Sequence, residues 1–280
     1  ENQLEKVYTD YTKMLEDETL DAIYIASPNS LHYEHAKLAL EYNKHVILEK
    51  PFTGNVEKAE EIIRLARDKS LILMEAISNV HLPHMEYVKK RIPELGDLKI
   101  VQANFSQYSS RYNALREGKV MNVFDPKMSG GALADINIYN LHFAVYLFGA
   151  PKSVIYKANT YKNGVDTSGV LSLAYGDFQA VLIGAKDSFS YNLAQIQGEN
   201  GYILMPSSTS TLESVVFETH ETRKEVDEQD KPTHYYQVEA FKALVDHKDY
   251  DKRDALLDHS LEVVKVAVEA RKQIGLDYEF

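Results

Sequence analysis

The sequence of 280 residues contains no cysteine. Disulfide bridges, thiolate metal sites and cysteine nucleophiles are therefore excluded. Long apolar runs are missing too, since none approaches the roughly 20 residues that a membrane-spanning helix needs. The first six residues are too polar for a signal peptide. These absences together predict a cytoplasmic protein that does not enter a membrane.

The chain has fewer basic than acidic residues. The 31 Lys and Arg residues face 42 Asp and Glu residues, which gives a formal net charge of -11 at pH 7. Nucleic acids and anionic membranes bind basic surfaces, so we expect neither as a partner. The content of 44% apolar and 26% charged residues is typical of a soluble globular protein with a substantial core.

Glycine loops that hold phosphates are also absent. None of the 13 glycines forms a Gly-x-Gly-x-x-Gly turn, and Gly130-Gly131 lacks the Lys-Ser/Thr that follows in a P-loop. The glycine pair instead predicts close packing in front of the next helix. No Gly-x-Ser-x-Gly motif supports serine hydrolysis. His81 and His84 lack a third ligand, so we expect no metal site.

The first part of the chain alternates between strands and helices. Continuous apolar runs predict buried strands at residues 22–26, 45–48 and 71–74. A helix is predicted over residues 31–42, with Asn29 or Ser30 as its cap, and another over the apolar face of residues 59–66. Such alternation predicts a parallel, doubly wound sheet.

The pattern changes after residue 77. Apolar and polar residues alternate over residues 101–106, which is typical of a half-exposed antiparallel strand. Helices are predicted at about 131–148, 234–247 and 255–274. Further strands are predicted at 153–161, 168–175, 178–185, 192–198, 201–205 and 213–218. The predicted fold class is α/β followed by α+β with a large, mainly antiparallel sheet.

Two polar segments follow neighbouring strands of the first sheet: residues 27–32 (Ser-Pro-Asn-Ser-Leu-His) and residues 49–51 (Glu-Lys-Pro). Ligands of open parallel sheets bind at the carboxyl ends of the strands, so we expect both segments at one rim. There Lys50 could orient a hydroxyl or carbonyl oxygen and exchange a proton. The alternative is an ion pair between Lys50 and a carboxylate such as Glu49 or Glu75.

A polar stripe runs along the predicted helix at 131–148. At about 100° per residue, Asp135, Tyr139, His142 and Tyr146 lie within an arc of roughly 60°. Nearly all other positions are apolar, so the helix is mainly buried. The stripe therefore faces either a pocket, where it could position and protonate an oxygen-bearing substrate, or an internal network of satisfied polar groups.

Three motifs, in their order and spacing, resemble the glucose–fructose oxidoreductase / inositol dehydrogenase / MocA family. They are residues 27–32, residues 49–51, and Gly-Gly-Ala-Leu-Ala-Asp at 130–135 with Tyr139 four residues on. The resemblance covers about residues 7–275. It implies an NAD(P)-dependent oxidoreductase that moves hydride between nicotinamide and a sugar, polyol or related hydroxy or keto compound.

The same resemblance implies two domains and a role for individual residues. Residues 1–77 are the remainder of a Rossmann domain, and residues 78–280 bind substrate and form a homodimer or homotetramer through the open sheet face. The final helices pack back on the first domain. The implied catalytic residues are Tyr139 as proton donor or acceptor, Lys50, which lowers its pKa, and Asp135. The implied substrate residues are His142, Asn79 and His81. The implied neighbours of the nicotinamide and its ribose are Ser27, Pro28, Asn29, His32, Glu49 and Lys50.

The chain departs from the family pattern in two places. Residues 77–81 lack the aromatic residue and the arginine that are typical of the dihydrodiol branch, so the resemblance does not identify the substrate. The strand and glycine turn that open a dinucleotide-binding domain are also missing. We therefore expect a native protein with about 45 further residues at its front. Without them, the strand at 22–26 has an unpaired apolar edge.

Two alternatives stay open. The first is a non-catalytic, dimeric binding or regulatory protein that uses the same cleft, which would explain tolerance of a missing glycine loop. Binding of NADH or NADPH without turnover of any polyol would favour it. The second is a reductase of a cyclic or imine substrate on the same fold.

Overall fold

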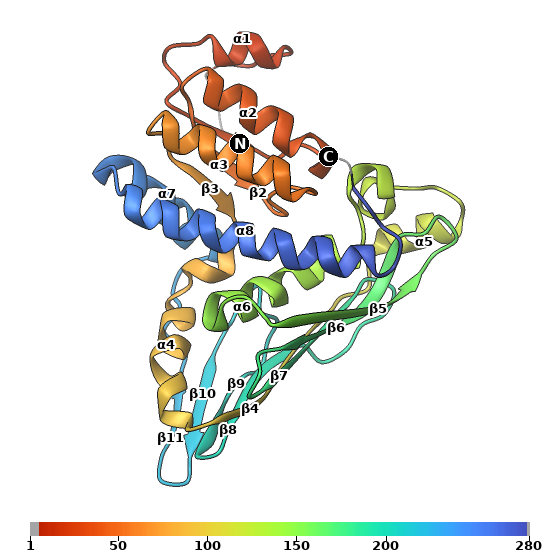
Figure 1. The fold of residues 1–280 in the computed structure, drawn as a ribbon, viewed down its shortest axis with the longest axis vertical. Coiled ribbons are helices and arrows are strands. Elements are labelled where there is room, and N and C mark those ends of the chain that lie inside the picture. The colour runs from red at the N-terminus through yellow and green to blue at the C-terminus, as the bar shows by residue number, and fades with distance from the viewer. Residues whose placement is uncertain (1–5, 279–280) are drawn as a thin grey trace.

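The structure is a computed structural model, and it describes residues 6–278. The chain forms two sheets, and Figure 1 shows the long helix α8 (Tyr250–Lys272) running between them. This arrangement confirms the predicted fold class of an α/β part followed by an α+β part. None of the helices within residues 6–278 is both long and apolar enough to cross a membrane.

The first sheet is parallel and contains β1 (Ala22–Ile25), β2 (His45–Glu49) and β3 (Leu73–Ala76), in that order. Strand β1 forms one edge of this sheet. The strands are connected by α2 (His32–Glu41) and α3 (Val56–Asp68), and the short α1 (Tyr11–Leu15) precedes them. In the sheet register Leu48 lies opposite both Ile25 and Glu75. The carboxyl ends of all three strands are therefore level, which brings the polar segments behind them to one rim.

The helix α3 follows its sequence pattern closely. Its predicted inner face, Ala59, Ile62, Ile63 and Ala66, is at most 2% exposed, and the side chain of Asn55 accepts a hydrogen bond from the amide of Lys58 to cap the first turn.

The predicted cap of α2 is wrong. Residues Asn29–Leu31 form a separate 3-10 turn, and no side chain caps the helix that follows. The side-chain amide of Asn29 instead donates to the main-chain oxygen of Ser129, 3.0 Å away in the second part of the chain. This long-range contact holds the residue at the domain interface rather than at the helix end.

The second sheet has eight strands in the order β11-β10-β9-β8-β4-β7-β6-β5. These are β4 (Leu98–Ser106), β5 (Ser153–Thr160), β6 (Asp166–Ala174), β7 (Gln179–Ala185), β8 (Leu193–Gly198), β9 (Gly201–Met205), β10 (Val215–Thr219) and β11 (Arg223–Val226). Strand β4 pairs antiparallel with β8 but parallel with β7. The alternation of apolar and polar residues in β4 therefore predicted its antiparallel pairing with β8 but not its parallel pairing with β7.

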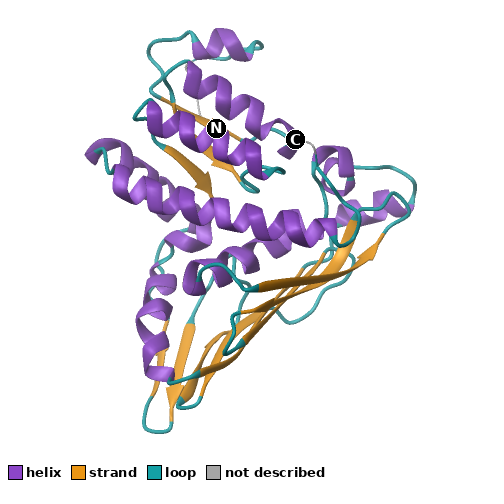
Figure 2. Ribbon diagram, viewed as in Figure 1, coloured by secondary structure: helices purple, strands orange, loops and turns teal. Residues whose placement is uncertain are grey.

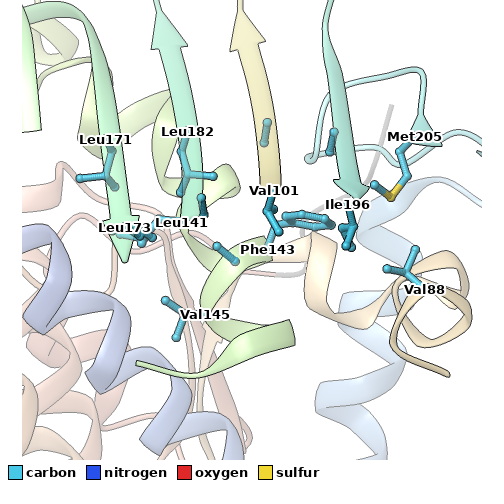
Figure 3. Packing of buried hydrophobic residues seen from close by; sticks show 14 of the residues in the cluster. Val88, Val101, Leu141, Phe143, Val145, Leu171, Leu173, Leu182, Ile196 and Met205 are labelled. Atoms are coloured by element: carbon cyan, nitrogen blue, oxygen red, sulfur yellow. The ribbon is translucent and has the colours of Figure 1, made fainter. Parts of the chain in front are cut away.

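Helices cover a single face of this sheet. Among them are α4 (Pro83–Arg91), α6 (Ile138–Phe148) and α8, while Figure 2 shows no helix of residues 6–278 on the opposite face. In Figure 3, Val101, Leu182 and Ile196 point from the strands toward Phe143 and its neighbours on α6. The remaining helices are α5 (Ser110–Arg116) and α7 (Thr233–His247).

The last long helix belongs to both cores. Leu257 and Val264 of α8 pack with the buried residues of the first sheet, whereas Val263 and Val266 pack with those of the second. A helix that is buried between two layers needs apolar residues on two of its sides. The helix α8 therefore fixes the two sheets relative to each other.

A π-helical turn, Leu133–Asn137, leads into α6. It follows Gly131, which has φ +126°, and a Cβ there would lie 2.0 Å from Oδ1 of Asp166. The carboxylate of Asp166 accepts hydrogen bonds from the amide of Leu133 and the hydroxyl of Tyr156. The prediction that the glycine pair permits close packing is thus confirmed.

Candidate active site

Lys50 and Asp135 meet between the two sheets. The ammonium group of Lys50, just after β2, lies 3.0 Å from Oδ1 of Asp135 and 2.8 Å from its main-chain oxygen. Asp135 stands in the π-helical turn before α6. The ion pair of Lys50 is therefore with Asp135, not with Glu49 or Glu75 as in the alternative drawn from the sequence.

A second lysine, which sequence reasoning missed, contacts the same carboxylate. Lys186, directly after β7, forms an ion pair with Oδ2 of Asp135, and its side chain is 9% exposed. The two positive charges hold the pKa of the Asp135 carboxyl well below its usual range, although burial opposes the shift. Asp135 is therefore an anion between two cations.

The ring of Tyr139 lies beside the same lysine. The ammonium of Lys50 is 5.2 Å from the ring centroid, within the range of a cation–π contact. Burial raises the pKa of the Tyr139 phenol, while the charge of Lys50 acts in the lowering direction that the resemblance implied. The hydroxyl has no hydrogen-bond partner among residues 6–278, so it is available to a substrate oxygen.

The polar segment at residues 27–32 is held to the Glu-Lys-Pro segment by His32. Its two ring nitrogens lie 2.8 Å from the main-chain oxygen of Pro51 and 3.0 Å from that of Ser27. Burial lowers the pKa of His32, although hydrogen bonds to both carbonyls act against this. Glu49 accepts hydrogen bonds from the hydroxyl of Tyr24 and the amide of Lys50. The rim is therefore cross-linked by polar contacts.

A cleft of about 180 Å³ opens where the two domains face each other. Pro28 and Asn29 line it from the first domain, and Asp135 and the exposed Arg111 line it from the second. Two of the predicted neighbours of the nicotinamide, Pro28 and Asn29, and one predicted catalytic residue, Asp135, thus line one space. Arg111, on α5, is a further residue of this cleft that the sequence did not single out.

The three predicted substrate residues lie deeper. The side chain of Asn79 is fully buried, and its amide group donates to the main-chain oxygen of Tyr139, 2.9 Å away. Burial lowers the pKa of His81 to about 4. His142 is also fully buried, and its ring lies between Glu75 and His259. Their contact with substrate stays a prediction.

The polar stripe along the helix divides into two parts. Asp135 and Tyr139 face Lys50, whereas Tyr146 packs its ring against His259 and donates its hydroxyl proton to Glu86. At 1.5 Å per residue the stripe is about 16 Å long, so its two ends cannot serve one small site. The first half of the stripe therefore lies beside Lys50, and the second half lies in a separate cluster around His259.

The groups in the first half of the polar stripe can exchange a proton with an oxygen atom and stabilise charge on it. Asp135 raises the pKa of Lys50 against the effect of burial, so Lys50 is a cation. The Tyr139 phenol, with its raised pKa, keeps its proton at neutral pH. A cation and a protonated phenol can bind and protonate a substrate oxygen, and dinucleotides bind at the carboxyl edge of doubly wound parallel sheets, so the arrangement suits an oxidoreductase that acts on a C–O bond.

Comparisons with known proteins place the chain within this class. Residues 1–77 match the model of the oxidoreductase family with an NAD-binding Rossmann fold, and residues 87–204 match the GFO/IDH/MocA C-terminal domain. The chain belongs to the GFO/IDH/MocA family of oxidoreductases, as the three motifs implied.

Two bacterial relatives match nearly the whole chain. The scyllo-inositol 2-dehydrogenase (NADP(+)) IolU of Bacillus subtilis is 40% identical over 275 residues, which are 97% of this chain and 83% of the relative. The oxidoreductase YgjR of Escherichia coli is 36% identical over 280 residues, which are 98% of this chain and 83% of the relative.

Solved structures show the same fold. The 3-ketoreductase KijD10 from Actinomadura kijaniata, in complex with NADP and TDP-benzene, superposes with a TM-score of 0.81 at 23% identity, covering 94% of this chain and 81% of that one. The UDP-N-acetylglucosamine 3-dehydrogenase GnnA from Acidithiobacillus ferrooxidans has a TM-score of 0.76 at 17% identity, covering 96% and 82%.

The residues of the cleft fit the nicotinamide end of such a cofactor. Pro28 and Asn29 lie at the carboxyl end of β1, where dinucleotides bind in Rossmann folds. The unpaired hydroxyl of Tyr139 and the cation of Lys50 are the groups that an oxygen beside the nicotinamide ring requires. The chain is thus an NAD(P)-dependent oxidoreductase.

Proposed function

We propose that the protein interconverts a secondary alcohol and a ketone of a cyclic polyol or sugar, with NADP as the cofactor. The observation that carries this is that Lys50 contacts both Asp135 and the ring of Tyr139, next to a cleft that Asp135 lines. The names of the relatives support the substrate class and the cofactor, since scyllo-inositol and NADP appear in the name of a relative with 40% identity. The expected location is the cytoplasm.

The nicotinamide, when bound, supplies or accepts the hydride. When a ketone is reduced, Tyr139 donates its phenolic proton to the carbonyl oxygen. Lys50 stabilises the negative charge on that oxygen, because an ammonium has three donor positions and Asp135 takes only two of them.

Asp135 and Lys186 act through Lys50. Asp135 keeps Lys50 charged and fixes its direction, and Lys186 holds the second oxygen of Asp135. Neither needs to touch the substrate for this. We propose Lys50 and Tyr139 as catalytic residues, Asp135 and Lys186 as positioning residues, and Ser27, Pro28, Asn29, His32 and Glu49 as the wall of the nicotinamide site.

A substrate screen tests the function. The native protein is incubated with NADP or NAD and a panel of inositols, xylose, glucose and other polyols, and formation of the reduced cofactor is followed by absorbance. We expect turnover of an inositol or a pyranose with NADP. Binding of NADPH, seen by fluorescence, without turnover of any member of the panel would favour a non-catalytic binding protein instead.

We also propose that the protein forms a homodimer or homotetramer through the open face of the eight-stranded sheet. Four large apolar side chains on strands of this face are between 37% and 53% exposed, namely Ile100, Ile155, Val170 and Ile183. Val170 and Ile183 are cross-strand neighbours in β6 and β7. Exposed apolar side chains on an uncovered sheet face are typical of an interface, and such a face suits a second copy related by a two-fold axis.

A further inference from the structure

The residues at the end of α8 contact main-chain oxygens on both sides of the active site, and the proposed mechanism does not use them. Nη2 of Arg271, in the last turn of the helix, donates to the main-chain oxygen of Gly54, 2.6 Å away. Beyond the helix, the hydroxyl of Tyr278 donates to the main-chain oxygen of Gly130. The segment with Tyr278 runs upward from the right-hand end of α8 in Figure 1. One end of one helix thus contacts a loop of the first sheet and the turn before α6.

The first contact holds the segment that follows Lys50. Gly54 lies four residues after Lys50, and Gly54 and the intervening residues 51–53 are all buried. The main-chain oxygen of Pro51 is also held, because Nδ1 of His32 lies 2.8 Å from it. A short buried segment that is held at two places transmits a displacement along its length. A shift of Gly54 is therefore expected to move Lys50.

The second contact holds the turn that precedes Asp135. Gly130 is followed by Gly131, whose main-chain oxygen accepts a hydrogen bond from the amide of Asp135, 3.1 Å away. Tyr278 is 2% exposed, so water does not compete for its hydrogen bond with Gly130. A shift of Gly130 is therefore expected to reach Asp135 through the glycine pair.

Arg271 and Tyr278 also contact each other. The central carbon of the Arg271 guanidinium lies 4.4 Å from the centroid of the Tyr278 ring, within the range of a cation–π contact. Arg271 is 4% exposed, and its Nε is buried without a hydrogen-bond partner within residues 6–278. Burial of a cation is costly unless it is paired, and apolar side chains often replace buried ions without loss of stability. Stability alone therefore does not explain an arginine at this position.

We propose that Arg271 and Tyr278 form a clamp that holds Lys50 and Asp135 in contact for the reaction. This inference rests on the proposed function, in which Lys50 must be charged and directed at the substrate oxygen. Both members of the clamp are positioning residues, because they act through main-chain oxygens on either side of the site and do not touch the substrate. The end of α8 is therefore part of the active-site architecture as well as of the fold.

Loss of the clamp has a defined effect on Lys50. Asp135, Tyr139 and Glu49 favour the charged form of Lys50, while burial opposes it. If the contact of 3.0 Å between Lys50 and Asp135 lengthens, the effect of burial dominates and the cation is lost at a lower pH. A variant that only unfolds more easily does not change this titration, so the pH dependence separates positioning from stability.

The test weakens each arm of the clamp and then restores one of them. With scyllo-inositol and NADP, we expect kcat to fall about tenfold in Arg271→Met and about threefold in Tyr278→Phe, because small misplacements of a reacting group lower the rate by up to about 10²-fold. In both variants kcat/KM should also fall on the alkaline side between pH 6 and 10. Arg271→Lys should recover most of the rate, because an ammonium group can still donate to Gly54 and lie over the Tyr278 ring.

Arg253→Met is the matched control. Arg253 lies in the first turn of α8, about 27 Å from Arg271 along the axis at 1.5 Å per residue. It is also 4% exposed, donates to the main-chain oxygen of Leu71 and packs over the ring of Tyr250. We expect Arg253→Met to lower the melting temperature at least as much as Arg271→Met does. Its kcat should stay within twofold of the wild-type value, with no alkaline fall.

The clamp is overturned if Arg271→Met and Tyr278→Phe both keep the wild-type kcat and pH profile. It is also overturned if Arg253→Met shows the same alkaline fall, because the effect then follows from lost stability. If Arg271→Met does not fold, Tyr278→Phe, which lacks a single oxygen atom, is measured alone and judged by the same criteria.

If the wild-type protein turns over no polyol, the proposed function fails, and the clamp is tested without turnover. A titration of ¹³C-labelled lysines followed by NMR gives the pKa of Lys50, whose signal is identified by its absence in Lys50→Met. This pKa should be lower in Arg271→Met than in the wild-type protein and unchanged in Arg253→Met. Equal values in all three proteins would contradict the clamp.

Discussion

The ammonium group of Lys50 lies 2.8 Å from the main-chain oxygen of Asp135, a residue 85 positions further along the chain. A second contact, 3.0 Å long, joins it to the carboxylate. The lysine belongs to the rim of the first sheet, and the aspartate to the helix that covers the second sheet. This ion pair therefore joins the two halves of the candidate site.

The two lysines that hold Asp135 should differ in effect. Lys50 also contacts the Tyr139 ring, whereas the described side-chain contact of Lys186 is with Asp135. We expect Lys50→Met to lower kcat by at least a hundredfold and Lys186→Met by about tenfold or less. Both variants should keep their melting temperature within a few degrees, because each leaves Asp135 with one lysine. Equal losses of kcat would contradict the distinct roles.

Asp135→Asn should shift the pH dependence of the reaction. Asp135 holds the pKa of Lys50 above its usual value, while burial acts in the opposite direction. Without the carboxylate, burial dominates and the pKa of Lys50 falls, so the cation is lost at a lower pH. In the wild-type protein the raised pKa keeps Lys50 charged from pH 6 to 10, so loss of this cation causes no alkaline fall of kcat/KM in that range. Asp135→Asn should show such a fall, and its absence would contradict the assignment of Lys50 as the required cation.

Gly131→Ala should destabilise the protein through the turn that precedes Asp135. Gly131 has φ +126°, and a new Cβ would lie 2.0 Å from the carboxylate of Asp166. We expect a loss of more than about 2 kcal/mol in the free energy of unfolding by urea. Gly164→Ala is the control, since Gly164 has φ +87° and no atom within 4 Å of a new Cβ. It should lose only about 1 kcal/mol, and equal losses would refute the packing argument.

The open sheet face can be tested by adding charge. Ile183→Asp places a carboxylate in the middle of the proposed interface, where burial of a charge is costly. Sedimentation velocity should then show a monomer in place of the wild-type oligomer. Val238→Asp, on α7 and away from the sheet, is the control, because Val238 is 48% exposed. An unchanged sedimentation coefficient for Ile183→Asp would remove this face as the interface.

Local features of the fold were predictable from the sequence. The inner face of α3 and most strands of the second sheet follow hydrophobic periodicity, which depends only on neighbouring residues. The strand β11 was missed, because Arg223–Val226 is short and charged and is a strand only through its pairing with β10. The parallel pairing of β4 with β7 was missed for the same reason.

The site was predictable only in part. Lys50, Asp135 and Tyr139 came from motifs, and the structure brings them together. Lys186 and Arg271 could not be found, because each meets its partner through the packing of distant elements rather than through spacing in the chain. A helical projection also ignores height along the axis, and so it joined Asp135 and Tyr146 in one stripe.

The rate of Tyr139→Phe tests the central claim most directly. This variant removes only the hydroxyl, which has no hydrogen-bond partner within residues 6–278, and keeps the ring beside Lys50. With scyllo-inositol and NADP, or with the substrate that the screen identifies, kcat should fall by about 10²- to 10⁴-fold. The melting temperature and the affinity for NADPH should not change. A kcat within twofold of the wild-type value would contradict Tyr139 as the proton donor.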